Sequence, residues 1–243
     1  MRWPAAALGG RVRCVKSGFM ELDHLVLLRD ELATFRGYLG GDLTAPVEHC
    51  GDWTLRELAE HLGEGNLWAA VAVTEQRGDY EPAPAPADIG SWFANTAAVL
   101  TDALARDPAA EAWTFSAPHT VGFWRRRRCL ETFVHRWDAE HALGLPSRMD
   151  PALCGDGIAE VIEVFVPRQV HRGRAAELTA AVRFTATDLD TSWVLGPGEA
   201  VATLSGTAEQ LMLALWNRLP MPWSASTGDT DRARGVLRGP LVP

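Results

Sequence analysis

The chain has 243 residues, of which 47% are hydrophobic and 22% are charged, and its formal net charge is −8. These proportions are typical of a globular protein with one large domain or two small ones, and they exclude a miniprotein that depends on disulfides. Charges interrupt every apolar stretch well before the length of a membrane span, so we expect no membrane association.

The charge is distributed unevenly along the chain. Residues 1–19 carry 4 basic side chains and no acidic one, residues 20–150 carry 11 basic and 21 acidic ones, and residues 151–243 carry 8 and 10. Because nucleic-acid binding depends on Lys and Arg, the acidic middle segment predicts no nucleic-acid partner. The 4 cysteines form no Cys-x-x-Cys pair, which favours a reducing, cytoplasmic location.

The first predicted elements follow a leader, residues 1–19, which has no apolar core typical of a secretory signal. We expect this leader to be disordered, or to precede the natural start of translation. Apolar residues then recur at helical spacing over residues 20–39. A second helix is predicted over residues 55–76, with Thr54 as the N-cap of a capping box.

A stretch of alternating Pro and Ala, residues 78–90, predicts an extended crossover connection. We expect Ser91 to cap a third helix that ends near residue 106, and a fourth helix over residues 122–143. Four helices joined by one long crossover indicate a helical bundle, which we assign to residues 20–150.

The pattern changes after this bundle to that of a small α+β domain, residues 151–243. We predict two helices that flank two strand-like runs, over residues 151–166, 178–187, 191–204 and 207–219. The predicted fold class is therefore α+β, with an N-terminal four-helix bundle and a smaller C-terminal α+β domain.

The predicted fourth helix carries two potential metal ligands one turn apart. Glu131 and His135 are four residues apart, which places a carboxylate and an imidazole on one helix face, and Asp138 follows on the same stripe. His61, at the margin of the apolar face of the second helix, would direct its imidazole towards the bundle interior. Bundles build metal sites from facing helices, so these residues predict a site with an open coordination position.

Other interpretations of these residues remain open. The polar stripe through Glu131 and His135 could be a solvated face with charge pairs between turns. We interpret the run Arg125–Arg128 as the solvated first turn of the fourth helix, with one or two of these arginines pairing internally. We expect Trp53 and Trp68 in the core. No site role is assigned to two of the cysteines or to the remaining histidines: Cys50, Cys129, His24, His49, His119, His141 and His171.

Three segments carry a resemblance to a known family. Residues 50–62 read Cys-Gly-Asp-Trp-Thr-Leu-Arg-Glu-Leu-Ala-Glu-His-Leu, residues 131–140 contain Glu-Thr-x-x-His-Arg-x-Asp-Ala-Glu, and residues 204–218 end in Leu-Trp-Asn-Arg. Together they resemble the mycothiol-dependent maleylpyruvate isomerase family, whose N-terminal domain is a DinB-like metal-binding bundle. The chain departs from the family pattern at Leu130, where a His is frequent, and at Asn217, where Gly is usual.

The resemblance implies that His61, Glu131 and His135 bind a divalent metal, with zinc expected, and that mycothiol serves as thiol cofactor or co-substrate. A cation would stabilise the thiolate, the reactive form of a thiol whose free pKa is about 8.5. The thiolate would then isomerise a small electrophile from cis to trans, or become attached to it by S-transfer. A thiol-independent enzyme of a specialised pathway and a non-catalytic binding or regulatory module remain alternatives.

Two further residues are candidate catalytic groups. Arg218 matches the family's Arg after the Leu-Trp pair and could bind a substrate carboxylate through two hydrogen bonds, or it could be a cation at a helix C-terminus. Asp138 could orient His61 or a bound water, or pair with an Arg. The expected partner is a small electrophile, in particular one that bears a carboxylate. The expected assembly is a monomer or a weak homodimer.

Overall fold

The computed structural model describes residues 22–243, so the expected leader at residues 1–19 lies outside the described residues. The chain divides into two compact units, of which the first ends at Met149 and the second begins at Asp150. Within the described residues, no helix combines the length and the hydropathy needed to cross a membrane.

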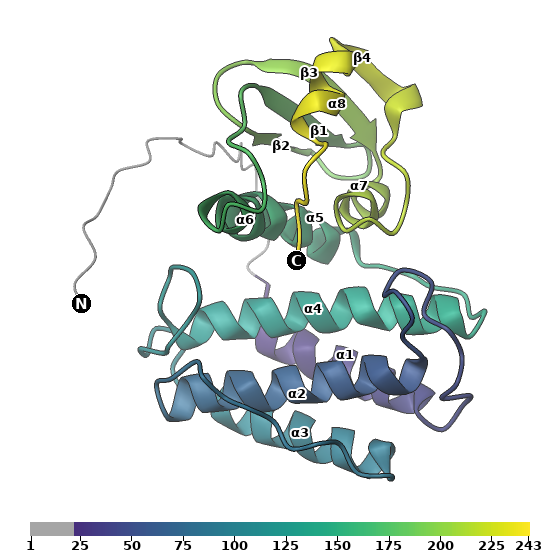
Figure 1. The fold of residues 1–243 in the computed structure, drawn as a ribbon, viewed down its shortest axis with the longest axis vertical. Helices are drawn as coiled ribbons and strands as arrows, with labels where there is room; N and C mark the ends of the chain where they lie inside the picture. Colours follow the sequence, from purple (N-terminus) through teal and green to yellow (C-terminus); the bar gives the residue numbers. More distant parts are fainter. Residues whose placement is uncertain (1–21) are drawn as a thin grey trace. The chain divides into compact units, whose positions relative to one another are not determined.

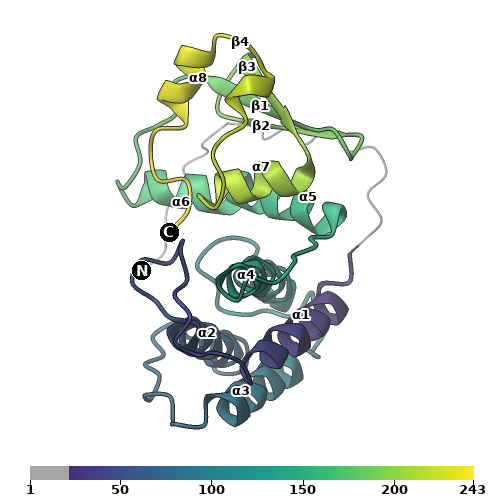
Figure 2. The same cartoon turned by 90° about the vertical axis from the view of Figure 1, so that its right-hand side faces the viewer.

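The first unit is a bundle of four helices, which confirms the predicted architecture (Figure 1). Figure 2, turned by 90°, views α4 nearly end-on. The helices are α1 (His24–Tyr38), α2 (Leu55–Thr74), α3 (Ile89–Ala103) and α4 (Val121–Ala142). Buried side chains such as Phe35 and Phe93, whose rings are 5.1 Å apart, fill the space between the helices.

The helix caps follow from short polar side chains. The capping box of Thr54 and Glu57 forms as predicted at the start of α2. The predicted cap of α3 was wrong by three residues: the carboxylate of Asp88 accepts a hydrogen bond from the backbone N–H of Ser91, so Ser91 lies inside the first turn. Asp88 competes well for this role because its carboxylate also interacts favourably with the positive end of the helix dipole.

The Pro/Ala connection between α2 and α3 contains neither helix nor strand over residues 79–86, in agreement with the prediction. The guanidinium group of Arg56 holds its end against α2, because it donates hydrogen bonds to the carbonyl oxygens of Pro86 and Ala87 at 2.9 and 3.2 Å. The connection is thereby fixed at the start of α3.

Helix α4 differs most from the prediction. Arg127 and Arg128 are buried, and Arg125 donates to the carbonyl oxygens of Leu104 and Arg106 at 2.9 and 2.7 Å. The polar stripe is therefore not solvated. The run Arg125–Arg128 is solvated only in part: Arg125 and Arg126 are half-buried, whereas Arg127 and Arg128 are buried and Arg128 pairs internally, as expected for one or two of the four. Charged side chains are tolerated inside because each has hydrogen-bonding partners, and an unpaired buried charge would be costly.

The second unit consists of a four-stranded sheet and its helices, as expected for an α+β domain. The expected helix at 151–166 continues to residue 171 through a π-helical turn, Val161–Phe165, just before Pro167. A widened turn relieves the clash between a proline ring and the carbonyl group four residues earlier. The elements are α5 (Pro151–Glu160), α6 (Val166–His171), β1 (Ala181–Ala186), β2 (Thr191–Leu195), β3 (Ala200–Gly206), α7 (Ala208–Leu215), β4 (Ser226–Gly228) and α8 (Thr230–Val236).

The strand order in the sheet is β2-β1-β3-β4, with β1 antiparallel to β2 and parallel to β3. The connection from β2 to β3 must therefore cross the start of β1, because β1 lies between these two strands in the sheet. Gly196 makes this close passage possible, because its φ is +102° and a Cβ there would collide with the carbonyl oxygen of Ala180. The turn at residues 196–198 was predicted, whereas β4 and α8 were not.

Candidate functional site

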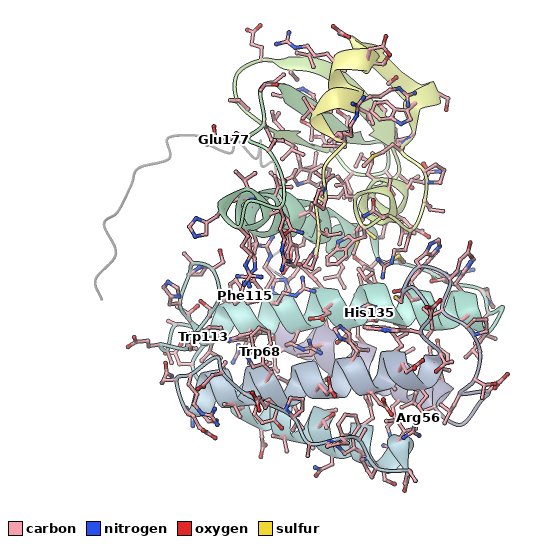
Figure 3. All side chains as sticks on the ribbon, in the orientation of Figure 1. Arg56, Trp68, Trp113, Phe115, His135 and Glu177 are labelled. Carbon is pink, nitrogen blue, oxygen red and sulfur yellow. The ribbon has the colours of Figure 1, made fainter. Side chains whose placement is uncertain are left out.

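Helices α2 and α4 bring His61, Glu131 and His135 together. His61 Nε2 lies 3.2 Å from Glu131 Oε1, and the ring centroids of His61 and His135 are 5.3 Å apart in an edge-on arrangement. One donor atom from each of the three side chains lies within 4.8 Å of the other two. Figure 3 labels His135 on α4. The His61 side chain is 39% exposed, so His61 lies at the margin of the bundle as predicted, with its imidazole directed towards Glu131 on α4.

The Glu131 carboxylate is shared between the two helices. Its Oε2 accepts a hydrogen bond from Arg128 Nη1 at 2.6 Å, and Arg127 lies 3.4 Å away, which leaves Oε1 facing His61. Burial alone would raise the pKa of Glu131. The guanidinium groups of Arg128 and Arg127 outweigh this effect and hold that pKa well below its ordinary value. Glu131 is therefore ionised at neutral pH.

The α2 sequence makes room for Arg128. Its Nη2 donates to the carbonyl oxygen of Leu62 and to the side-chain oxygen of Asn66, both at 2.9 Å. A Cβ at Gly65 would collide with Arg128 Nη1, so glycine at this position on α2 leaves the space that the guanidinium group occupies. Two helices far apart in sequence thus hold the candidate ligand Glu131 through one arginine.

His135 is oriented by Asp138. Its Nδ1 lies 2.9 Å from Asp138 Oδ2, and both side chains are buried. Burial lowers the pKa of His135, and the neighbouring Asp138 only partly offsets this, so the imidazole is neutral at pH 7. With the Nδ1 proton donated to Asp138, Nε2 keeps a lone pair. Of the roles left open for Asp138, orienting His61 does not hold: Asp138 follows His135 by three residues on the same helix, and its carboxylate contacts His135 instead.

The turn before α2 forms part of the surroundings of the site. Cys50 Sγ lies 3.7 Å from Asp138 Oδ2, and the ring of Trp53 lies 5.0 Å from the His61 ring. Trp53 is only half-buried and contacts a candidate ligand, so assigning it to the core was incomplete. The Cys-Gly-Asp-Trp motif indicated this segment, but spacing alone does not show that it folds back against α4.

Trp68, the other tryptophan expected in the core, belongs to an aromatic cluster away from the ligands. Its ring contacts Trp113, Phe115 and Trp124 at centroid distances of 5.8, 6.1 and 5.0 Å. Figure 3 shows Trp68, Trp113 and Phe115 together, well apart from His135 along α4.

Arg218 belongs to the second unit and follows α7. Its Nη1 donates to the carbonyl oxygen of Trp216 at 2.8 Å, a contact typical of a cation at a helix C-terminus. Asn217 adopts φ +60°, a left-handed conformation that favours glycine and that asparagine tolerates better than most other residues. The helix therefore ends as a glycine would end it, despite the departure from the family pattern.

The residues His61, Glu131 and His135 fit a divalent transition metal. Imidazole nitrogen and carboxylate oxygen are common zinc ligands at about 2.0 to 2.2 Å, so two ligand atoms of a tetrahedral site lie about 3.3 to 3.5 Å apart. The 3.2 Å between His61 Nε2 and Glu131 Oε1 is close to that spacing. The carboxylate is ionised, the His135 imidazole is neutral, and Asp138 provides the carboxylate that usually supports a ligating histidine.

The chain matches two family models, which together span most of its length. The model described as the mycothiol maleylpyruvate isomerase N-terminal domain matches residues 25–140. The model described as the MDMPI C-terminal domain matches residues 152–235. No curated protein matches the sequence.

Two solved structures share the fold. The crystal structure of a mycothiol-dependent maleylpyruvate isomerase is 16% identical, with a TM-score of 0.64 over 86% of this chain and 92% of that chain. The structure of a histidine-to-alanine mutant of such an isomerase is 15% identical, with a TM-score of 0.60 and the same coverage of 86% and 92%.

Proposed function

The chain belongs to the mycothiol-dependent maleylpyruvate isomerase family, and on this basis we propose that it is a metal-dependent enzyme that uses mycothiol to act on a small electrophile. The observation that carries the proposal is the 3.2 Å approach of His61 Nε2 to Glu131 Oε1, with His135 beside them. The three donor atoms come from two helices, as in metal sites built inside helical bundles. Ordinary charge pairs on a helix surface join residues of one helix and would not bring His61 to Glu131.

We assign the metal to His61, Glu131 and His135, with zinc expected. When bound, such a cation would favour the thiolate of mycothiol over the thiol and so supply the nucleophile. Three protein ligands leave room for an additional one, which is typical of catalytic zinc sites. Asp138 would hold the Nδ1 proton of His135, and Arg128 would keep Glu131 ionised and in position.

We further propose that Arg218 binds a carboxylate group of the substrate. A guanidinium group presents parallel N–H donors that match the two oxygens of a carboxylate. The helix ending fixes where this side chain begins, because the backbone N–H of Arg218 donates to the carbonyl oxygen of Leu213 at 2.8 Å.

Metal analysis of tag-free protein tests the ligand assignment. We expect near-stoichiometric divalent metal in the wild type, and a large loss in His61→Ala and in Glu131→Ala. His171→Ala, which removes an exposed histidine at the end of α6, is the matched control and should keep the metal. Less than about 0.2 metal ions per wild-type chain, or unchanged content in both variants, would exclude the assignment.

Product analysis separates the two proposed chemistries. A cis-unsaturated dicarboxylate is offered with mycothiol, and the products are identified by mass spectrometry and NMR. Formation of the trans isomer with no consumption of thiol indicates an isomerase, whereas a stable thioether indicates an S-transferase. Equal turnover with and without mycothiol would contradict the thiol dependence.

A further inference from the structure

A second cluster of metal-binding side chains lies at the C-terminal end of α4, and none of its members belongs to the site described above. It consists of Glu48, His49 and His141, which we call the outer cluster. His141 Nε2 lies 2.9 Å from Glu48 Oε2, and the rings of His49 and His141 are 5.9 Å apart. One donor atom from each residue lies within 4.8 Å of the other two.

The two imidazoles of the outer cluster are positioned by one indole ring. His141 stacks on Trp137 at 5.0 Å with an interplanar angle of 6°, and His49 stacks on it at 5.8 Å and 28°. Trp137 itself is buried, so it provides a fixed surface. The outer cluster is therefore held in place and is not a chance encounter of mobile surface side chains.

The turn that carries Glu48 and His49 is also constrained. The backbone N–H of Val47 donates to the carbonyl oxygen of Trp53 at 2.8 Å, and that of Cys50 donates to the carbonyl oxygen of Val47 at 3.0 Å. These bonds fix the shape of the turn that carries the two adjacent residues. The donors consequently come from two segments that are 93 residues apart in sequence.

The surroundings of the outer cluster favour a cation. Glu48 supplies a carboxylate, which is ionised at neutral pH because the ordinary pKa of a glutamate is about 4.3. His141 lies in the last turn of α4, where the helix dipole is negative. The side chains of His141 and Glu48 are 48% and 66% exposed, so an ion can reach them from solvent.

We propose that Glu48, His49 and His141 form a second site for a divalent transition metal, with Zn²⁺ as the ion that two imidazoles and one carboxylate suit best among those abundant in cells. Solvent completes the coordination. The site binds more weakly than the inner one, because no buried carboxylate or arginine holds its ligands.

This proposal does not rest on the proposed function. Zinc titration of the metal-free full-length protein by isothermal calorimetry tests it. We expect a tight binding event from the inner site and a weaker one from the outer cluster. Glu48→Gln, an exposed and conservative change, should weaken the second event at least about tenfold, and His141→Ala should abolish it. His171→Ala, the matched control, should leave both events unchanged.

His61→Ala separates this proposal from the inner site, because it should remove the tight event and keep the weaker one. If the inner site fails, a single event that His141→Ala abolishes still supports the outer cluster. A weaker event that is absent, or that survives both Glu48→Gln and His141→Ala, overturns the proposal. Circular dichroism of each variant establishes that it has folded.

Discussion

At the scale of single residues, Arg128 connects the packing of the bundle to its candidate ligands. Its side chain is 1% exposed, yet it bonds Glu131, the carbonyl oxygen of Leu62 and the side chain of Asn66. A buried ion pair adds little to stability over a well-packed apolar pair, but removing one partner leaves the other charge uncompensated. We therefore expect the removal of Arg128 to lower the free energy of unfolding strongly, although the intact ion pair itself contributes little to it.

The variant Arg128→Met keeps most of the side-chain volume and removes the charge. We expect the free energy of unfolding of the metal-free protein to fall by about 3 to 5 kcal/mol, as measured by urea denaturation. Arg77→Met, at an exposed residue paired with Glu75 and Asp79, should have little effect. A loss no greater for Arg128→Met than for Arg77→Met would contradict this account.

Tyr38 makes stability dependent on pH in the alkaline range. Burial, together with the 2.6 Å hydrogen bond to Glu140, raises the pKa of Tyr38 from 10.0 to about 12. The folded-state pKa lies above the unfolded value, so this stabilisation is fully present below pH 10 and is lost as the pH rises through about 12. We expect Tyr38→Phe to be less stable than the wild type at neutral pH. The difference in unfolding free energy between the two proteins should shrink as the pH rises from 10.0 to about 12. A difference in unfolding free energy that stays constant over that range would argue against the bond.

At the scale of elements, helical spacing located the four bundle helices but did not show which faces are buried. The polar stripe on α4 has the pattern of a surface helix, yet its residues meet partners from other helices. Arg128, for example, bonds the carbonyl oxygen of Leu62 on α2 at 2.9 Å across 66 positions of sequence. Such pairs depend on which helices become neighbours, and local periodicity carries no information about that. The strand β4 was missed because three residues are too few to show alternation.

A pair of helical glycines tests the packing of α2 against α4. Gly37 in α1 has open space around a potential Cβ, whereas a Cβ at Gly65 in α2 would meet the guanidinium group of Arg128. We expect Gly37→Ala to stabilise the protein by up to about 1 kcal/mol, because alanine is the better helix former. Gly65→Ala should destabilise it, because the buried Arg128 cannot move aside without losing its bond to Glu131.

Thermal unfolding followed by circular dichroism measures both glycine variants. Equal gains in melting temperature for Gly65→Ala and Gly37→Ala would show that Arg128 has room to move. The packing account of α2 and α4 would then be wrong.

At the scale of the whole molecule, composition and charge predicted the broad class, and the residue patterns predicted the fold class. The candidate ligands were chosen from helix spacing and family resemblance, since His61 and Glu131 are 70 residues apart. The outer cluster was not predicted, because Glu48 and His49 lie in a turn and no helical periodicity relates them to His141. The excess of acidic side chains in residues 20–150 is consistent with a protein segment that attracts cations.

The most direct test of the central claim is the visible absorption spectrum of the Co²⁺-substituted protein during titration with mycothiol. We expect the spectrum of the wild type to change and to saturate as the thiol reaches the ion held by His61, Glu131 and His135. The His141→Ala variant, which keeps those three ligands, should behave in the same way. A wild-type spectrum that mycothiol leaves unchanged would contradict the claim that this bundle binds a metal in order to activate a thiol.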